Sequence, residues 1–136
     1  MPAAEGTYTL LLRLDSAVER EVGALGSLEF PTGWYAYTGS ALGPGGFARI
    51  DRHRRIAAGT ADTRHWHIDY FLPVCEPRGV YTAADEAIEC AVAQSLPGDR
   101  LPAFGASDCQ CDSHLVHTAD ESRLRQALER HYGPAR

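Results

Sequence analysis

The sequence predicts an α+β domain in which a small mixed or antiparallel β-sheet is flanked by helices. The first observation is its length of 136 residues, which suits one domain with a substantial core. The second is that short apolar segments bounded by glycine alternate with segments of helical apolar spacing. Their order is strand, hairpin, strand, helix, strand, helix, strand, helix, which is typical of an α+β domain. We therefore expect a single domain over residues 1–136.

The N-terminal third carries clear strand signals. They predict a strand over residues 6–14, a hairpin over residues 18–30 and a strand over residues 33–39. In the last of these, Tyr35 and Tyr37 are two residues apart and share one face, whereas Trp34 and Ala36 point to the other. Two tyrosines are thus expected on the same side of the sheet.

The first helix is predicted over residues 46–58, and Gly59 is a natural stop after it. Its apolar positions Phe47, Ile50 and Ala57 are expected on one face. The side chains expected toward the other side are those of Arg49, Arg52, His53 and Ile56.

Two further helices begin at sequences that resemble capping boxes, in which a threonine is followed three residues later by an acidic residue. Thr82 and Asp85 predict a helix that runs to about Leu96, and Thr118 and Glu121 predict a C-terminal helix. The apolar face of the C-terminal helix consists of Leu124, Leu128 and Tyr132. The remaining segments are residues 65–72, which fit a strand or a short helix, residues 78–82 and 114–118, which fit strands, and a loop over residues 97–113.

The composition excludes several classes of protein. The net charge of −5 argues against a non-specific coat for nucleic acid, but it leaves room for a local basic surface. No apolar run approaches the roughly 18–20 residues of a membrane span, and the N-terminus does not resemble a signal peptide. We therefore expect a cytoplasmic protein with no membrane partner. The four cysteines are expected to be reduced thiols, metal ligands or nucleophiles, not disulfides.

Five residues have the chemistry of phosphodiester hydrolysis: Tyr8, Tyr37, Arg49, His53 and Glu89. A carboxylate can hold a divalent metal ion, and the ion stabilises charge on the leaving oxygen. A guanidinium stabilises the phosphate, and a tyrosine orients or deprotonates a water. The histidine is a general base, a residue that supports one, or a partly buried side chain. The structural alternatives are ordinary sheet tyrosines, a solvated arginine and a helix-surface glutamate, and Glu86 is the alternative carboxylate.

These residues lie in segments that resemble the GIY-YIG nuclease superfamily. Its two name-giving motifs are matched by GTY at residues 6–8 and YTG at residues 37–39. The segment RIDRH resembles the helix that carries the catalytic arginine, and AIECAVA resembles the metal-ligand helix, which implies these roles for Arg49 and Glu89. One Mg²⁺ or Mn²⁺ ion is the cofactor that the resemblance implies. The gap between the two motifs is longer than usual and is expected to hold an inserted hairpin.

More closely, the chain resembles a branch of this superfamily whose members occur alone or attached to endonuclease III-type glycosylases. The matching runs are GTYTLLLRL, EFPTGWYAYTGSALGPGG, HWHIDY and FGASDCQCDSHL. The resemblance implies a DNA substrate and a place in DNA repair, beside a glycosylase-type partner.

Glycines and cations around these motifs are candidate nucleic-acid contacts. Free N–H groups at the start of the first helix suit a phosphate, and a plain turn is the equal alternative. The candidate contacts are Gly39, Ser40, Gly45, Gly46, Arg52, Arg55, Arg64 and His67.

Two other functions stay open at this point. The superfamily pattern includes a late asparagine and a basic residue after the second motif. This chain has no asparagine and has Ser40 and Ala41 after that motif, which favours a nucleic-acid-binding module without catalysis. Cys109, Cys111 and His114 suggest a metal or redox site as the second alternative, although buried thiols that brace a loop are the favoured interpretation. Zinc needs about four ligands, and the missing ones would have to come from Cys75, Cys90 or His117.

Overall fold

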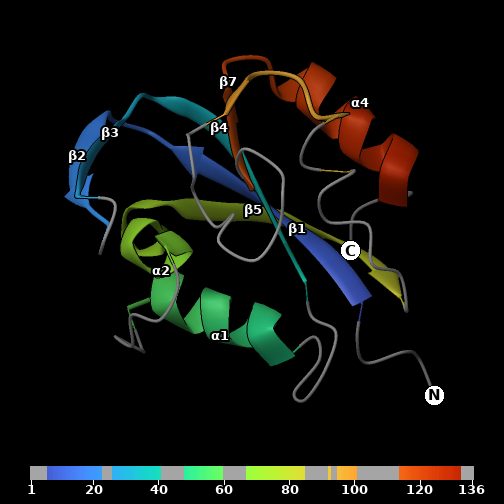
Figure 1. The fold of residues 1–136 in the computed structure, drawn as a ribbon, viewed down its shortest axis with the longest axis horizontal. Coiled ribbons are helices and arrows are strands. Elements are labelled where there is room, and N and C mark those ends of the chain that lie inside the picture. Colours follow the sequence, from blue (N-terminus) through green and yellow to red (C-terminus); the bar gives the residue numbers. More distant parts are fainter. Residues whose placement is uncertain are drawn as a thin grey trace.

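The computed structural model describes residues 6–22, 26–40, 48–59, 67–84, 92, 95–100 and 114–132. A central sheet lies between two helical layers (Figure 1). Helices α1 (Ala48–Ala57) and α2 (His67–Phe71) cover one face, and α4 (Glu121–Tyr132) covers the other. A short 3-10 helix, η2 (Leu72–Val74), follows α2 directly. Within these ranges, no helix is long and apolar enough to cross a membrane.

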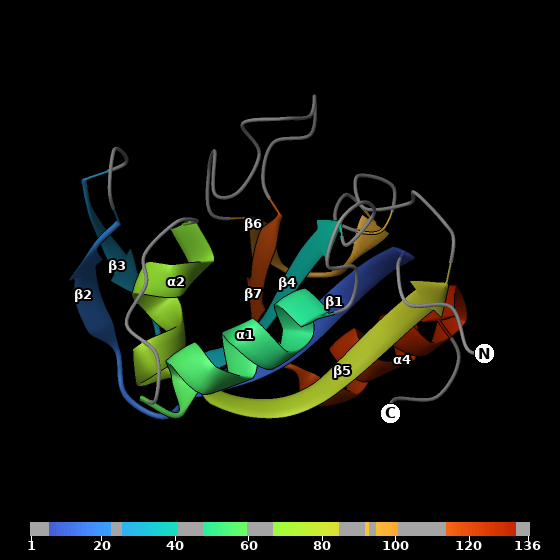
Figure 2. The ribbon, with the colours of Figure 1, turned by 90° about the horizontal axis from the view of Figure 1, so that it is seen from below.

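Five strands form the central sheet in the order β5-β1-β4-β7-β6, and each neighbouring pair is antiparallel. The strands are β1 (Gly6–Leu14), β4 (Gly33–Ser40), β5 (Glu76–Ala84), β6 (Asp99–Arg100) and β7 (Leu115–Thr118). β1 therefore lies inside the sheet, between β4 and β5, with α1 on one side and α4 on the other (Figure 2). The predicted α+β class with an antiparallel sheet is confirmed.

The predicted hairpin is confirmed, and it continues the ribbon formed by β1 and β4. Its strands are β2 (Val18–Glu21) and β3 (Ser27–Phe30), which pair as a separate two-stranded sheet. Between the last β1–β4 pair and the first β2–β3 pair, residues 15–17 lie on one strand and only residues 31–32 on the other. An unequal count of this kind bends a ribbon, as a β-bulge does. The hairpin accordingly leaves the central sheet and lies beside α2 (Figures 1 and 2).

Each face of the sheet has its own apolar core. Along β1, the even-numbered side chains from Tyr8 to Leu14 belong to the cluster with α1 and α2, and Leu11 belongs to the cluster with α4. Leu124 and Leu128 are buried in the α4 cluster, as the apolar spacing of the C-terminal helix predicts.

The strand β4 alternates in the same way. Tyr35 and Tyr37 belong to the cluster with α1 and α2. Ala36 belongs to the α4 cluster, and Trp34 packs against it. The predicted placement of the two tyrosines on one face of the sheet is therefore confirmed.

Aromatic rings anchor the hairpin to α2. The Phe30 ring stacks on Phe71 with 4.2 Å between ring centroids, and Tyr35 meets Phe71 edge-on at 4.8 Å. Arg20 adds a polar contact, because its Nε donates to the carbonyl oxygen of Tyr70 at 3.2 Å. The hairpin thus shares the core of the α1–α2 face.

Helix α1 buries a different set of residues from the predicted one. Ile50, His53 and Ile56 are buried, and Ala57 is half-buried. The prediction that His53 and Ile56 lie away from the core is wrong. His53 and Ile56 follow Ile50 at intervals of three residues, which suits one buried helical face. The imidazole can be buried there because it forms a hydrogen bond inside the core. Phe47 lies outside the described residues.

Both predicted capping boxes are wrong. Thr82 lies within β5, which continues to Ala84, in keeping with the preference of a β-branched side chain for strands. The C-terminal helix is capped by Asp120, whose Oδ1 accepts from the N–H of Arg123 at 3.1 Å. Thr118 ends β7 and accepts from the N–H of Asp120 at 3.1 Å, so it supports the cap without being it.

The remaining segments agree with the sequence in part. Strands are confirmed within the predicted segments 6–14, 33–39, 78–82 and 114–118. The segment over residues 65–72, which fits a strand or a helix, contains α2, and the loop predicted over residues 97–113 contains β6. Most of the helix predicted from Asp85 to Leu96 lies outside the described residues, as do residues 101–113.

We expect Phe30→Ala to lower the free energy of unfolding by about 3–5 kcal/mol, because the ring contacts with α2 are lost and a cavity remains. The neighbouring Glu29 is exposed, so Glu29→Ala is the matched control and should change the free energy by less than about 0.5 kcal/mol. Urea unfolding followed by circular dichroism measures both variants. Similar losses in the two would contradict the anchoring of the hairpin through Phe30.

Candidate active site

Tyr8 and His53 meet in the core between β1 and α1. The Tyr8 hydroxyl oxygen lies 2.7 Å from His53 Nε2, within a hydrogen bond that joins residues 45 apart in the sequence. Tyr8 is 2% exposed and His53 is 1% exposed. The tyrosine of the first motif and the histidine of the arginine-rich helix therefore form one buried pair.

Gly39 of the second motif makes room for the Tyr8 ring. The two residues face each other in the pairing of β1 with β4. A Cβ atom at position 39 would lie 2.6 Å from the Tyr8 hydroxyl oxygen and 2.7 Å from its ring carbon Cζ. Contacts this short do not occur in folded proteins, so only glycine at position 39 allows Tyr8 to reach His53 along this path.

Tyr37 approaches the same histidine from β4. Its ring meets the His53 ring edge-on, with 6.1 Å between centroids. Tyr35, two residues earlier on the strand, makes a different contact, because its hydroxyl donates to the carbonyl oxygen of Pro31 in the bend between β3 and β4. Burial, with a smaller contribution from Cys75, raises the pKa of Tyr35, so this phenol stays protonated and serves the packing. Of the β4 tyrosines, Tyr37 is the one beside His53.

Helix α2 brings a buried carboxylate to the other side of the imidazole. Asp69 is fully buried, and its Oδ1 lies 4.0 Å from His53 Nδ1. Arg52 donates to both of its carboxylate oxygens, from Nη1 to Oδ1 at 3.1 Å and from Nη2 to Oδ2 at 2.8 Å. Two-point pairing of this kind is the strongest form of an ion pair and fixes both side chains. The site is therefore a connected set of Tyr8, Tyr37, His53, Asp69 and Arg52.

Asp69 is the residue that sequence reasoning missed. It lies in the HWHIDY segment, whose secondary structure the sequence leaves open. An acidic residue among apolar neighbours is a signal in itself, since a buried carboxylate needs a cation. The nearby arginines of α1 offer several candidate partners, and only the fold selects Arg52.

The structure brings together some of the predicted site residues and leaves others undescribed. Tyr8, Tyr37, Gly39 and His53 come together, and Arg52 joins them through Asp69. Arg55 is exposed on α1. The backbones of Arg49, Ser40 and His67 belong to α1, β4 and α2, but their side chains lie outside the described atoms. The predicted residues that lie wholly outside the described ranges are Gly45, Gly46, Arg64, Glu86, Glu89, Cys90, Cys109 and Cys111.

The predicted metal roles stay predictions. Within the described ranges, no three His, Cys, Asp or Glu side chains gather closely enough to hold a metal ion. His117, considered as a zinc ligand, places Nε2 3.0 Å from the carbonyl oxygen of Thr32. His114 is buried directly before β7, where its carbonyl oxygen accepts from the N–H of Thr38 at 3.0 Å.

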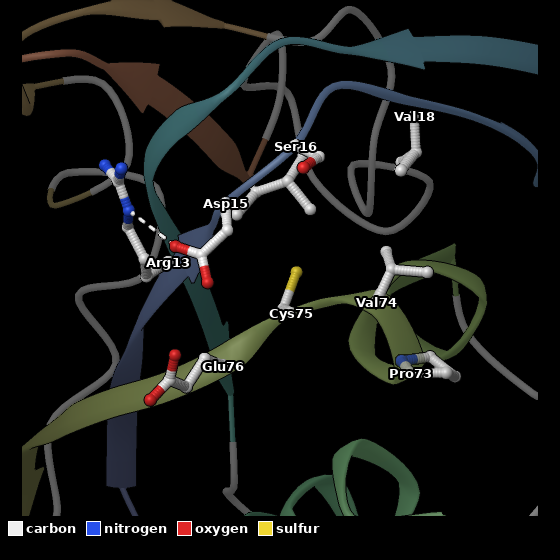
Figure 3. Close-up of a pocket in the computed structure, with 9 residues that line it drawn as sticks. Arg13, Asp15, Ser16, Val18, Pro73, Val74, Cys75 and Glu76 are labelled. Atoms are coloured by element: carbon white, nitrogen blue, oxygen red, sulfur yellow. Dashed lines mark hydrogen bonds and ion pairs between the residues drawn. The ribbon is translucent and has the colours of Figure 1, made fainter.

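Cys75 lies at the opposite end of β1 from Tyr8, in a cavity of about 280 Å³ between β1 and η2. Figure 3 shows its side chain pointing into the space between Asp15 and Val74. Arg13 pairs with Asp15 at the rim at 3.2 Å. Burial raises the pKa of the Cys75 thiol, which disfavours the thiolate that a nucleophile or a metal ligand needs. We therefore regard Cys75 as a packing residue.

A family model described as "Domain of unknown function DUF123" matches residues 7–135. The chain belongs to the DUF123 family. Comparisons with curated proteins and with solved structures give no match. The part matched to the DUF123 domain extends from β1 through α4, so it contains the Tyr8–His53 hydrogen bond and the Arg52–Asp69 pair.

We expect Gly39→Ala to lower the free energy of unfolding by about 1–3 kcal/mol, because the added methyl group overlaps the Tyr8 ring. Gly79→Ala on β5 is the matched control, since a Cβ there meets Leu11 at an ordinary 3.8 Å, and it should be close to neutral. Urea unfolding measures both.

The same measurement in a Tyr8→Leu background isolates the contact. There the loss caused by Gly39→Ala should largely disappear, because the overlapping ring is gone. An undiminished loss in that background would show that the glycine serves the backbone and not the tyrosine.

Proposed function

We propose that this domain is a metal-dependent endonuclease of the GIY-YIG type that hydrolyses phosphodiester bonds in DNA. The observation that carries the proposal is the hydrogen bond between Tyr8 and His53, formed where Gly39 of the second motif gives the phenol room. The first motif, the second motif and the arginine-rich helix thus converge on one point. This convergence supports the resemblance, because three separate parts of the family pattern become neighbours in space.

The proposed chemistry starts with the proton of the Tyr8 hydroxyl. Tyr8 passes this proton to His53 Nε2 and takes one from a water molecule, whose oxygen then attacks the phosphorus atom. The bond from phosphorus to the leaving oxygen breaks, and the negative charge that develops needs a cation nearby. Tyr37 packs against the imidazole that receives the proton and limits its movement.

Two residues whose side chains lie outside the described atoms complete the proposal. Arg49 would stabilise the phosphate; its backbone lies in α1, one helical turn before His53. Glu89 would hold one Mg²⁺ or Mn²⁺ ion, which supplies positive charge at the leaving oxygen when bound. Asp69 is poorly suited to hold the ion, because both of its oxygens already accept from Arg52.

The proposed setting is the cytoplasm, in DNA repair, beside a glycosylase-type partner. The exposed Arg55 on α1 would contribute to a local basic surface on a protein whose net charge is −5. Such a surface would raise the local concentration of DNA beside Tyr8 and His53.

The burial of Tyr8 and His53 favours a second candidate function. A pair that is 2% and 1% exposed also suits a nucleic-acid-binding module in which the hydrogen bond only fixes α1 on the sheet. This module would bind damaged or branched DNA without cleaving it. Cleavage assays on bound substrates separate the two functions.

The first test is nicking of supercoiled plasmid and of branched oligonucleotides with Mg²⁺ or Mn²⁺. We expect cleavage by the wild type, none in the presence of EDTA, and a loss of at least about 100-fold in Glu89→Ala and in Arg49→Ala. Arg54→Ala is the matched control, because Arg54 is an exposed arginine on the same helix and should retain the wild-type rate. A wild type that binds these substrates without cleaving them would establish the binding module instead.

A second test addresses the tyrosine. Tyr8→Phe removes only the hydroxyl group, and we expect it to lower the single-turnover cleavage rate by about 10²–10⁴-fold, as for the loss of a proton-transfer group. Tyr35→Phe is the control, because the Tyr35 hydroxyl donates to a carbonyl oxygen in the bend between β3 and β4. This variant should lower stability while leaving the cleavage rate of the folded protein unchanged. Equal rate losses in the two variants would remove Tyr8 from the proposed mechanism.

A further inference from the structure

We propose that Arg52 acts within the protein as a positioning residue, which compensates the charge of Asp69 and thereby keeps His53 neutral so that Nε2 can accept the Tyr8 proton. The catalytic meaning of this inference rests on the proposed nuclease function. What Arg52 and Asp69 control is the charge of the His53 imidazole. Arg52, expected from the sequence to contact a phosphate, instead binds a carboxylate within the protein.

The geometry directs Arg52 inward. Its guanidinium binds both oxygens of Asp69, a side chain that is fully buried, and the Arg52 side chain is itself only 18% exposed. A guanidinium held in this fork has two of its donor groups committed to the carboxylate. Arg55, three residues further along α1, is exposed and remains the better candidate for a phosphate.

The carboxylate would otherwise control the imidazole. Asp69 Oδ1 lies 4.0 Å from His53 Nδ1. A lone carboxylate at that distance in a buried site favours the protonated imidazole, whereas burial of the imidazole favours its neutral form. The charge of Arg52 offsets that of Asp69, so burial decides and the neutral form is favoured.

A neutral imidazole also has a defined tautomer here. With the proton on Nδ1, the side that faces Asp69, Nε2 carries the lone pair. Tyr8 then donates its hydroxyl proton to Nε2 across 2.7 Å. During the reaction this proton moves to Nε2, the phenol oxygen takes a proton from water, and Asp69 faces the imidazolium that results.

Two neutral groups in the described part of the chain also face His53. They are the phenols of Tyr8 and Tyr37, from β1 and β4. The segments β5 and η2 also contact α1, and they contribute Val80 and Leu72 to the same apolar cluster. Of the described groups named here, Asp69 and Arg52 are the charged ones.

The test is an NMR titration of the His53 imidazole, assigned by its absence in His53→Gln. Arg52→Gln should raise the pKa of His53 by about one pH unit, because the carboxylate is no longer compensated. Asp69→Asn should lower the pKa of His53, because the imidazolium loses its anionic neighbour. The double variant should return close to the wild type.

The opposite signs are what distinguish positioning from a purely structural role. If the pair only stabilised the fold, both single variants would move the His53 titration toward that of a solvent-exposed histidine, and shifts in the same direction would overturn the inference.

Arg52→Lys provides a further check in case Asp69→Asn does not fold. It retains the charge, so its His53 pKa should stay near the wild-type value while that of Arg52→Gln rises; equal values in these two variants would also overturn the inference.

This experiment needs no DNA, so it separates the two proposals. Opposite shifts in a protein that does not cleave DNA would support the charge balance and reject the nuclease. Cleavage by a protein whose His53 titration is unaffected by Arg52→Gln would support the nuclease and reject the role of Arg52.

Discussion

The pairing of β1 with β4 is the constraint on which the rest of the structure depends. Eight consecutive residue pairs join the two strands, from Thr7 opposite Ser40 to Leu14 opposite Gly33. The register decides which side chains face α1 and which face α4, because a shift of one residue would exchange the two faces. It also places the tyrosine of one motif directly over the glycine of the other. The two apolar cores and the candidate site follow from this one alignment.

Both faces of this ribbon carry a buried polar network. On the α4 face, the Thr9 hydroxyl binds those of Thr38 and Tyr132, at 2.8 and 2.7 Å, and so connects both strands to the C-terminal helix. On the other face, Tyr8 connects β1 to His53 of α1. Polar groups in a core have to be satisfied in one specific arrangement, so these networks oppose sliding of the helices over an otherwise apolar surface. They provide specificity of packing in addition to stability.

The sequence was sufficient for the parts of the fold that depend on local patterns. Short apolar segments bounded by glycine predict the strands over residues 6–14 and 33–39. Strand periodicity, which is a property of the backbone, predicts the sides on which Tyr35 and Trp34 lie. The motifs also predict that Tyr8 and His53 belong to one site. The start of the C-terminal helix was missed, because a threonine and an aspartate two residues apart both suit an N-cap, and local sequence does not decide between them.

The parts that the sequence could not predict depend on partners distant in the chain. The burial of His53 depends on its hydrogen bond with Tyr8, which is 45 residues away in the sequence. Asp69 belongs to a segment whose secondary structure is ambiguous, and its role depends on Arg52 of another helix. In the sequence, Arg52 cannot be told apart from the other arginines of α1, because all are the same residue type with similar neighbours. Only tertiary structure distinguishes the arginine that turns inward.

The bend between the central sheet and the hairpin separates two registers. Because three residues oppose two at that point, the register shifts by one residue between the β1–β4 pairing and the β2–β3 pairing. The bend and most of the length of β1 and β4 lie between the hairpin and the pair formed by Tyr8 and Gly39. What has to persist is the contact of Phe30 with Phe71, which holds the base of the hairpin on α2. The hairpin is therefore a part of this domain that can change without moving the tyrosines and the histidine.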